Sequence, residues 1–317
     1  MKKKLLLLLS ISLLLGKVTY AQLDTEFTQF MDNKMYYNPG YAGVEGLTRL
    51  SLMLRSKWTG YSGTFDAGGA PTTEVLTMSV PIFKFNSGFG AYIINDHLGP
   101  INNLALKGSF AYHVAVKDAK LSFGVNAGFF SQSIDFDSYR PNDIGDPLIL
   151  SGKQTQFKPD MGFGVFYQAK SFYGSLSVDH LLSPSLNYGS DELRNSLEPI
   201  AYIMAGYHYD ITYNLELTPS LLVQSDFNNY LINFGAIITY NEKFWGGITY
   251  KYMESASVIL GMSFLKSNAM QIGYGFDYIV HDQLAKQATS NEIRLSYALP
   301  INPFGSKKVV RTPRFRR

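Results

Sequence analysis

Two pairs of adjacent acidic and histidine residues are the strongest candidates for catalysis in this sequence. Asp179 precedes His180, and His281 precedes Asp282, each pair near the expected end of an extended segment. An acid and a base placed in this way are what a surface hydrolase would need. Adjacent residues of a strand point to opposite faces, however, so neither dipeptide forms a ready pair. Because the sequence also offers no nucleophile elbow or comparable motif, we expect no enzyme activity.

Metal and cofactor ligands are equally weak as patterns. The 5 histidines are scattered without the spacing of a zinc site. Gly-x-Gly occurs at 88–90, 162–164 and 273–275, but no third glycine and no helix pattern follow at the spacing of a dinucleotide-binding loop. We interpret these glycines as strand residues beside aromatic side chains, and we expect neither a metal nor a cofactor.

The first residues of the chain predict export. Three lysines at 2–4 precede an apolar run at 5–15, and Ala21 is a small residue just before Gln22. This order is typical of a secretory signal peptide. No segment offers the roughly 20 consecutive apolar residues of a membrane-spanning helix. We therefore predict a signal peptide at 1–21 and a mature chain that begins near Gln22.

Charge is divided unevenly along the chain. The sequence has 28 Lys and Arg against 25 Asp and Glu, and without the four lysines of the leader 24 basic residues face 25 acidic ones. The tail, 300–317, holds six of these basic residues and no acid, so the remaining chain has 18 against 25. Such a body lacks the basic face that nucleic-acid binding requires. The tail is expected in the periplasm, either as a solvated end or docked on an acidic partner or anionic lipid through Lys307, Lys308, Arg311, Arg314, Arg316 and Arg317.

Apolar and polar residues alternate with period two along most of the chain. Between 121 and 129, for example, Leu, Phe, Val, Ala and Phe alternate with Ser, Gly, Asn and Gly. Alternation of this kind favours strands over helices. It predicts about fourteen strands, at 47–58, 72–81, 88–96, 103–116, 120–133, 159–168, 171–180, 199–209, 212–224, 230–240, 243–253, 256–265, 269–280 and 290–299.

Strand length and loop length favour a membrane barrel over a secreted sandwich or propeller. Several runs continue for ten or more residues, as a tilted membrane strand requires, whereas sandwich strands usually have about five or six. Aromatic residues gather near strand ends, as in interfacial girdles. Long connections at 59–71, 134–158, 181–198 and 281–289 alternate with mostly short turns, which places both termini on the periplasmic side. We predict one all-β domain, a transmembrane antiparallel outer-membrane β-barrel at 47–299, preceded by a lumenal or periplasmic segment at 22–46.

The segment at 27–43 resembles the opening motif of the PorP/SprF family of the type IX secretion system. It reads Phe-Thr-Gln-Phe-Met-Asp-Asn-Lys-Met-Tyr-Tyr-Asn-Pro-Gly-Tyr-Ala-Gly. Similar segments recur almost to the end of the mature chain, at 55–61 with 70–73, 88–100, 273–278 with 290–297 and, more weakly, 174–182. The first loop departs from the family pattern because Gly-rich sequence is inserted at 62–69.

The opening motif also has a plain physical interpretation. Asn-Pro-Gly at 38–40 is a turn sequence, because Pro fixes φ and Gly permits positive φ, and it could simply lead into the first strand. The preceding stretch at 29–38 is too polar for lipid, so we expect it in the lumen or on the periplasmic rim. The resemblance suggests partner contacts at Gln29, Asn38, Pro39, Tyr41 and Trp58.

The resemblance implies an outer-membrane component of type IX secretion, a pathway of Bacteroidota. Such a barrel would support export or surface anchoring of a cargo protein that carries a C-terminal secretion domain, such as a large gliding-motility adhesin. Other implied partners are outer-membrane lipid and further secretion components, either a periplasmic ring or a peptidoglycan-binding protein. The alternative is an outer-membrane channel for small or hydrophobic solutes, which would need an open, charged constriction.

Overall fold

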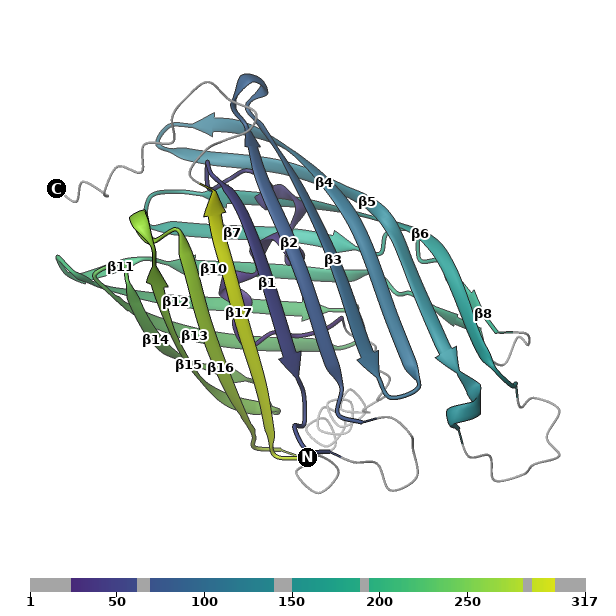
Figure 1. The fold of residues 1–317 in the computed structure, drawn as a ribbon. Helices are drawn as coiled ribbons and strands as arrows, with labels where there is room; N and C mark the ends of the chain where they lie inside the picture. Colours follow the sequence, from purple (N-terminus) through teal and green to yellow (C-terminus); the bar gives the residue numbers. More distant parts are fainter. Residues whose placement is uncertain (1–23, 62–68, 140–149, 189–193, 282–286, 300–317) are drawn as a thin grey trace, which may run out of the picture.

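The computed structural model describes residues 24–61, 69–139, 150–188, 194–281 and 287–299, and in them a closed antiparallel barrel of 14 strands (Figure 1). The first strand pairs with the last, from Thr48 opposite Leu299 to Ser56 opposite Asn291. This pairing closes the sheet, so the fold class and the strand number predicted from alternation are confirmed. None of the described helices is long and apolar enough to cross a membrane.

The barrel strands follow one another around the wall in chain order. A short strand, β11, continues β10 along β12, and β8 and β9 form a separate hairpin. The strands are β1 (Thr48–Ser56), β2 (Thr72–Ile82), β3 (Ser87–Leu98), β4 (Ile101–Val116), β5 (Ala119–Asp135), β6 (Lys153–Gln168), β7 (Phe172–Asp179), β8 (Ser185–Asn187), β9 (Arg194–Ser196), β10 (Ile200–Tyr207), β11 (Tyr209–Thr212), β12 (Leu215–Ser225), β13 (Tyr230–Tyr240), β14 (Phe244–Lys251), β15 (Ser255–Phe264), β16 (Met270–Ile279) and β17 (Thr289–Leu299). The helical turns between them are η3 (Phe83–Phe85), η4 (Phe136–Ser138) and η6 (Lys266–Asn268).

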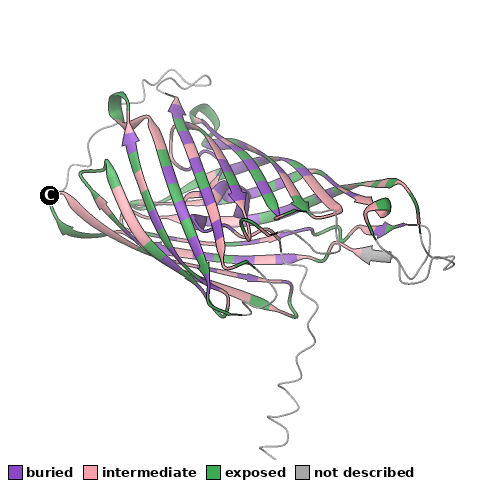
Figure 2. Ribbon diagram, turned by 60° about the horizontal axis from the view of Figure 1, so that its bottom comes forward, coloured by how far each residue is buried: buried purple, intermediate pink, exposed green. Residues whose placement is uncertain are grey.

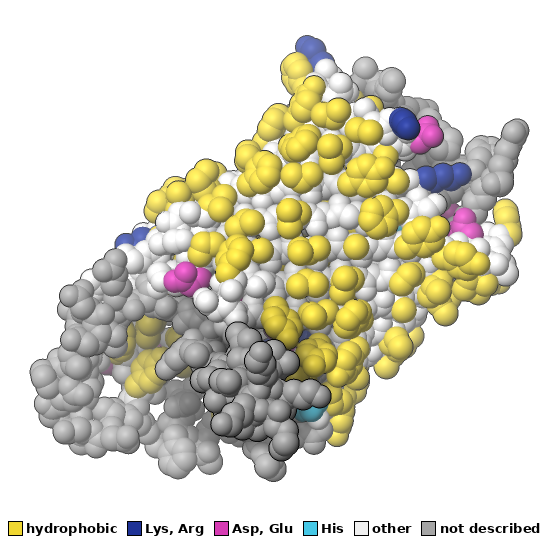
Figure 3. All heavy atoms as spheres, turned by 180° about the vertical axis from the view of Figure 1, so that it is seen from behind, with side chains coloured by type: hydrophobic (Ala, Val, Ile, Leu, Met, Phe, Trp, Pro, Cys, Tyr) yellow, Lys and Arg dark blue, Asp and Glu magenta, His cyan; other side chains and the backbone are white. Residues whose placement is uncertain are grey.

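Alternate residues of each strand face opposite sides of the wall. In β3, Phe89 and Ile93 are exposed on the outside, whereas Gly90, Tyr92 and Ile94 are buried. Figure 2 shows this alternation of buried and exposed residues along the strands, and Figure 3 shows hydrophobic side chains covering much of the outer face. An apolar exterior on a closed wall of hydrogen-bonded strands is what a bilayer requires of a strand protein.

The two ends of the barrel differ in the length of their connections. One end, here called the turn end, carries the short links at 83–86, 117–118, 169–171, 241–243 and 265–269. The other, here called the loop end, carries the longer links at 57–71, 136–152, 180–199 and 280–288. The loop end also has short links, such as residues 99–100, which join β3 to β4.

Two strand boundaries differ from those predicted. β6 begins at Lys153 and not at 159, because Pro159 lies within the strand opposite Phe129 of β5. The pairing of β6 with β7 starts only at Phe163, so the missing N–H of Pro159 faces an unpaired side, where proline is tolerated. The turn expected at 210–211 lies instead at 213–214, where β11 and β12 extend the wall as a hairpin.

Residues 24–46, here called the lumenal segment, run through the inside of the barrel. Asp24 contacts His180 and Tyr202 at the loop end, whereas Gly43 contacts Ser79 near the turn end, where β1 begins. The described chain therefore starts at the loop end and finishes, at Leu299, at the turn end. Both termini lie outside the described residues, so their placement on the periplasmic side stays a prediction.

Candidate functional site

The lumenal segment forms an apolar core inside a polar barrel. It folds as three short turns, η1 (Phe30–Asp32), α2 (Lys34–Tyr37) and η2 (Pro39–Tyr41). Phe27, Tyr36 and Tyr37 are buried and meet edge to face, with ring centroids 5.1 to 6.3 Å apart. Aromatic pairs of this geometry add to the free energy gained by burying the rings. The segment is therefore a packed element and not a loose tail.

Glycines on the inner face of the wall give the segment room. A Cβ added to Gly124 of β5 would lie 2.2 Å from the backbone nitrogen of Gly40, and one added to Gly88 of β3 would lie 2.1 Å from the carbonyl oxygen of Ala42. Gly273 of β16 is similarly close to the side chain of Gln29. Gly88 and Gly124 thus permit close approach of two backbones, whereas Gly90, Gly164 and Gly273 leave room for side chains of the segment, a role that glycine fills for lack of a side chain.

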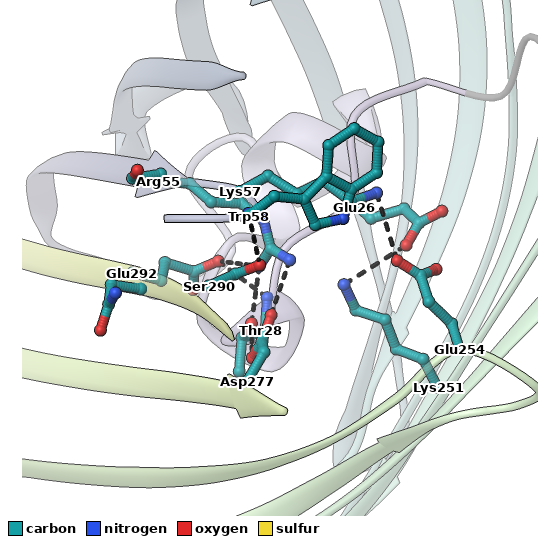
Figure 4. A network of polar contacts seen from close by, with 12 residues as sticks. Glu26, Thr28, Arg55, Lys57, Trp58, Lys251, Glu254, Asp277, Ser290 and Glu292 are labelled. Atoms are coloured by element: carbon teal, nitrogen blue, oxygen red, sulfur yellow. Dashed lines mark hydrogen bonds and ion pairs between the residues drawn. The ribbon is translucent and has the colours of Figure 1, made fainter. Parts of the chain in front are cut away.

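Near the loop end the segment is bonded to both strands that close the barrel (Figure 4). Arg55 of β1 lies 2.6 Å from Asp277 of β16 and 3.0 Å from Glu292 of β17, and all three are buried. Glu292 also accepts hydrogen bonds from the backbone N–H groups of Thr28 and Gln29, both at 2.8 Å. A buried carboxylate is stable only when it is paired and hydrogen-bonded, so the segment completes the environment of Glu292.

A second set of charges flanks this network in Figure 4. Lys251 of β14 lies 3.3 Å from Glu26 of the segment, and Lys57, just after β1, lies 3.2 Å from Glu254 in the β14–β15 turn. Burial alone would raise the pKa of Glu254, but Lys251 and Lys57 outweigh it and hold that pKa well below its usual value. Glu254 is therefore a fixed negative charge at the loop end.

The start of the segment meets a third charged cluster on the far side of the lumen. Lys107 of β4 lies 2.5 Å from Asp160 and 2.6 Å from Asp179, and the His180 ring lies between Asp160, at 2.5 Å, and Asp24, at 3.1 Å. Burial lowers the pKa of His180, but the Asp24 and Asp160 carboxylates outweigh burial and raise it to about 10. The protonated ring in turn lowers the pKa of Asp24 to about 2 against the opposing effect of burial.

This cluster corrects our interpretation of the Asp179-His180 dipeptide. His180 has a φ of 57°, in the left-handed region, so the chain leaves the strand alternation immediately after Asp179. Both side chains are consequently buried on the same side of the wall. Asp24, Asp179 and His180 bring possible metal-ligating atoms within 4.8 Å of one another, but Lys107 and the His180 ring already pair with these carboxylates. The arrangement is an ion-pair cluster.

The predicted partner-binding residues of the segment are bonded to the barrel itself. Gln29 donates through its side-chain amide to Glu292, and Asn38 donates to the carbonyls of Val165 and Leu176. Pro39 opens η2 directly after Asn38, whose side chain accepts from the N–H of Gly40. Tyr41 donates to Glu45, and its ring lies 5.0 Å from that of Phe166. Contact of these residues with another protein stays a prediction.

Trp58 lies apart from those four, at the loop end. Its backbone N–H donates to Ser290, and the Lys57 ammonium lies 5.5 Å from the centre of its ring. The six basic residues from Lys307 to Arg317 lie outside the described residues. The predicted site residues therefore divide between the lumen, the loop end and a part of the chain that the structure does not describe.

Sequence reasoning missed the charged residues of the wall. Arg55, Lys107 and Glu292 stand at polar positions of alternating strands, and that is the signal by which they could have been found. A charge at such a position in a membrane barrel must face the lumen, because a charged side chain on the lipid face is costly. A chain with several such charges needs partners for them inside, and here the lumenal segment supplies the acids Asp24, Glu26 and Asp32.

An apolar exterior, a closed antiparallel wall and a charged interior define an outer-membrane β-barrel protein. The chain belongs to the family described as "Type IX secretion system membrane protein PorP/SprF", which matches residues 19–297. The resemblance suspected from the opening motif is thus confirmed. No curated protein matches the chain.

Solved structures similar to this chain are outer-membrane barrels. The CymD monoaromatic hydrocarbon channel is 11% identical, with 90% of this chain and 96% of that chain covered and a TM-score of 0.51. The Ralstonia pickettii toluene transporter TbuX is 14% identical, with 83% and 92% covered and a TM-score of 0.49. A Pseudomonas aeruginosa FadL homologue is 14% identical, with 84% and 93% covered and a TM-score of 0.46. At such identities the likeness concerns the fold alone.

Proposed function

We propose that this barrel supports type IX secretion by binding, without catalysis and without an open pore. Its binding partner would be a cargo protein with a C-terminal secretion domain, such as a large gliding-motility adhesin, or another secretion component, either of a periplasmic ring or a peptidoglycan-binding protein. The barrel would hold such a partner at one of its two ends while its apolar exterior anchors it in the outer membrane.

The observation that carries this proposal is the filled lumen. The segment at 24–46 is packed against wall glycines and bonded to charged residues of several strands. A channel must leave a path for its solute, whereas here the chain itself occupies the path. Contacts at the loops and turns are then the natural way for the barrel to act on another protein.

Deletion of the gene tests the proposal. We expect one or more large proteins with C-terminal secretion domains to be lost from the surface or retained in the cell, as measured by proteomics of the surface and medium. Uptake of small polar and hydrophobic solutes should stay within about twofold of the parent strain, a margin well below the effect of losing a transport path. Normal secretion combined with impaired uptake would instead favour the channel.

A matched variant separates loss of the barrel from loss of binding. Substitution of exposed loop-end residues, for example Leu181→Ser with Leu182→Ser, changes the rim and leaves the lumenal contacts in place. The expected result is a barrel present at normal abundance in the outer membrane and still resistant to unfolding in cold detergent. Secretion defects in this background would be attributable to the rim.

A further inference from the structure

A cavity of about 220 Å³ lies at the turn end, where the lumenal segment leaves the barrel. Gly43, near the end of the lumenal segment, forms one side of it, and the turn after β2 and the adjoining ends of β2, β3, β4 and β5 form the rest. The polar residues around it include Ser87, His113 and Lys120, and the apolar ones include Pro81 and Phe83.

Among the described residues, one donor at this cavity has no hydrogen-bond partner and a second has only a poorly oriented one. Ser87 is 2% exposed, and its hydroxyl makes no hydrogen bond. The Nδ1 of His113 lies 2.7 Å from the Ser122 hydroxyl, while its Nε2, near the Ala42 carbonyl, has no hydrogen bond of ordinary geometry. Buried polar atoms without partners are rare in folded proteins and are commonly satisfied by a bound molecule or ordered water.

Lys120 gives the cavity its charge. Its ammonium donates to the Val44 carbonyl at 3.1 Å, which uses one of its three N–H donors. In the described part of the chain no carboxylate forms an ion pair with Lys120, and none lines the cavity. Donors and one cation without a counter-charge complement an anion that accepts several hydrogen bonds.

The neighbouring cavity at the same end shows the contrast. It measures about 180 Å³ and is lined by charges of both signs, among which Asp32 pairs with Arg294 and Glu216 with His208. A cavity lined by both acids and bases does not favour an anion by its charge. The cavity at Lys120 differs because its described lining includes a lysine and no carboxylate.

We propose that the cavity at Ser87, His113 and Lys120 binds a carboxylate joined to a small apolar group. Lys120 and the Ser87 hydroxyl would hold the carboxylate, and Pro81, Phe83 and Ala115 would contact the apolar part. The volume corresponds to about seven water molecules at roughly 30 Å³ each, enough for this group but not for a folded domain. The basic tail of this chain would be repelled by Lys120, so the carboxylate comes from another molecule.

Two sources carry this chemistry, the C-terminus of a peptide chain and a free short fatty acid, and titrations of the full-length barrel in detergent micelles distinguish them. The probes are N-acetylalanine for a chain terminus, hexanoate for a fatty acid and N-acetylalaninamide as the neutral control. Saturation-transfer NMR should detect binding of at least one carboxylate and none of the amide. Preference for N-acetylalanine assigns a chain terminus, and preference for hexanoate assigns a fatty acid.

Two variants locate the binding at this cavity. Lys120→Gln should raise the dissociation constant at least about tenfold, or about 1.4 kcal/mol, whereas Lys117→Gln, an exposed lysine three residues away, should leave it unchanged. Ser87→Ala should also weaken binding while the barrel unfolds no more easily, because it deletes a buried hydroxyl that has no partner. Equal binding by the amide, or unchanged affinity in both Lys120→Gln and Ser87→Ala, would overturn the proposal.

Discussion

Substitution of Gly124 by alanine tests whether the lumenal segment is truly interlocked with the wall. The new Cβ would lie 2.2 Å from the Gly40 nitrogen and 2.3 Å from the Pro39 carbonyl carbon, both backbone atoms. Ordinary contact begins at 3.4 Å, so the segment must move by about 1 Å or the strand must yield. Overpacking of this kind costs about 1 to 3 kcal/mol.

That cost sets the size of the expected effect. If it falls on the seated state of the segment, the unseated fraction rises about 5- to 150-fold, since every 1.4 kcal/mol is a factor of ten. The chain has no cysteine, so a single Met35→Cys substitution on the buried segment provides a reporter. The rate of maleimide labelling in outer-membrane preparations should rise by that factor in Gly124→Ala.

Gly108→Ala is the matched control. Gly108 lies in β4, and the nearest atoms to an added Cβ are 4.0 Å away on the ring of Phe89, which is exposed on the outside of the wall. Labelling of the reporter should stay within about twofold of the parent, because surface substitutions usually change stability by no more than about 0.5 kcal/mol. If Gly124→Ala labels no faster than Gly108→Ala, the segment is not held by close contact and the filled-lumen argument is wrong.

Four further experiments examine other parts of the structure. Arg55→Met leaves Asp277 and Glu292 buried without their counter-charge and should lower the free energy of urea unfolding by about 3 to 5 kcal/mol. Arg49→Met, at a partly exposed pair with Glu45, should lower it by less. Equal losses in the two variants would contradict a stabilising role of the buried Arg55 ion pairs. The Asp24–His180 pair should stabilise the barrel fully between about pH 3.8 and 6.5. This stabilisation should be lost as pH rises through about 10, where folded His180 deprotonates, and as pH falls through about 2, where folded Asp24 is protonated. A His180→Gln barrel should lack the alkaline loss of stability, and an unchanged pH profile in that variant would refute the assignment. A short tag placed after Gln22 should be reached by antibody from the side of the long loops and a tag after Arg317 from the other side; detection of both from one side would contradict the crossing of the lumen. Truncation after Gly305 should leave folding intact and reduce co-purification of periplasmic partners at low salt, since the Debye length falls from about 10 Å at 0.1 M to about 3 Å at 1 M; full recovery of every partner would show that the tail has no docking role.

Period-two alternation was sufficient to predict the wall. The side-chain types of residues such as Phe89, Gly90 and Ile93 indicate which face of the sheet each residue occupies. The strand number and the barrel could therefore be predicted from the sequence. Boundaries were less certain where a residue contradicts its strand locally. The strand expected at 159–168 begins six residues earlier in the structure, and only the pairing of neighbouring strands reveals that Pro159 lies within β6 beside an unpaired side.

The contents of the lumen could not be predicted in the same way. Alternation shows that Lys107 and Glu292 face inward but not which groups they meet. Lys107 pairs with Asp179, 72 residues away, and Glu292 pairs with Arg55, 237 residues away in the chain. The role of a glycine in a strand is ambiguous for a related reason. From the sequence Gly124 is only a residue that weakens a strand, and its role in close packing appears once the backbone that approaches it is known. Long-range contacts of this kind leave no local pattern.

The bonds from the lumenal segment to the closing strands have a consequence for assembly. Thr28 and Gln29 are held by Glu292 of β17, and Thr28 also accepts a hydrogen bond from Arg55 of β1, so the segment touches both edges of the seam that is joined last in chain order. A finished barrel would admit the segment only by threading its free end past packed rings. Zipping of the seam around a segment already in place requires no such passage. The lumenal segment would then act as an internal template, and a chain that lacked it would be expected to stall as an open sheet with two unpaired edges.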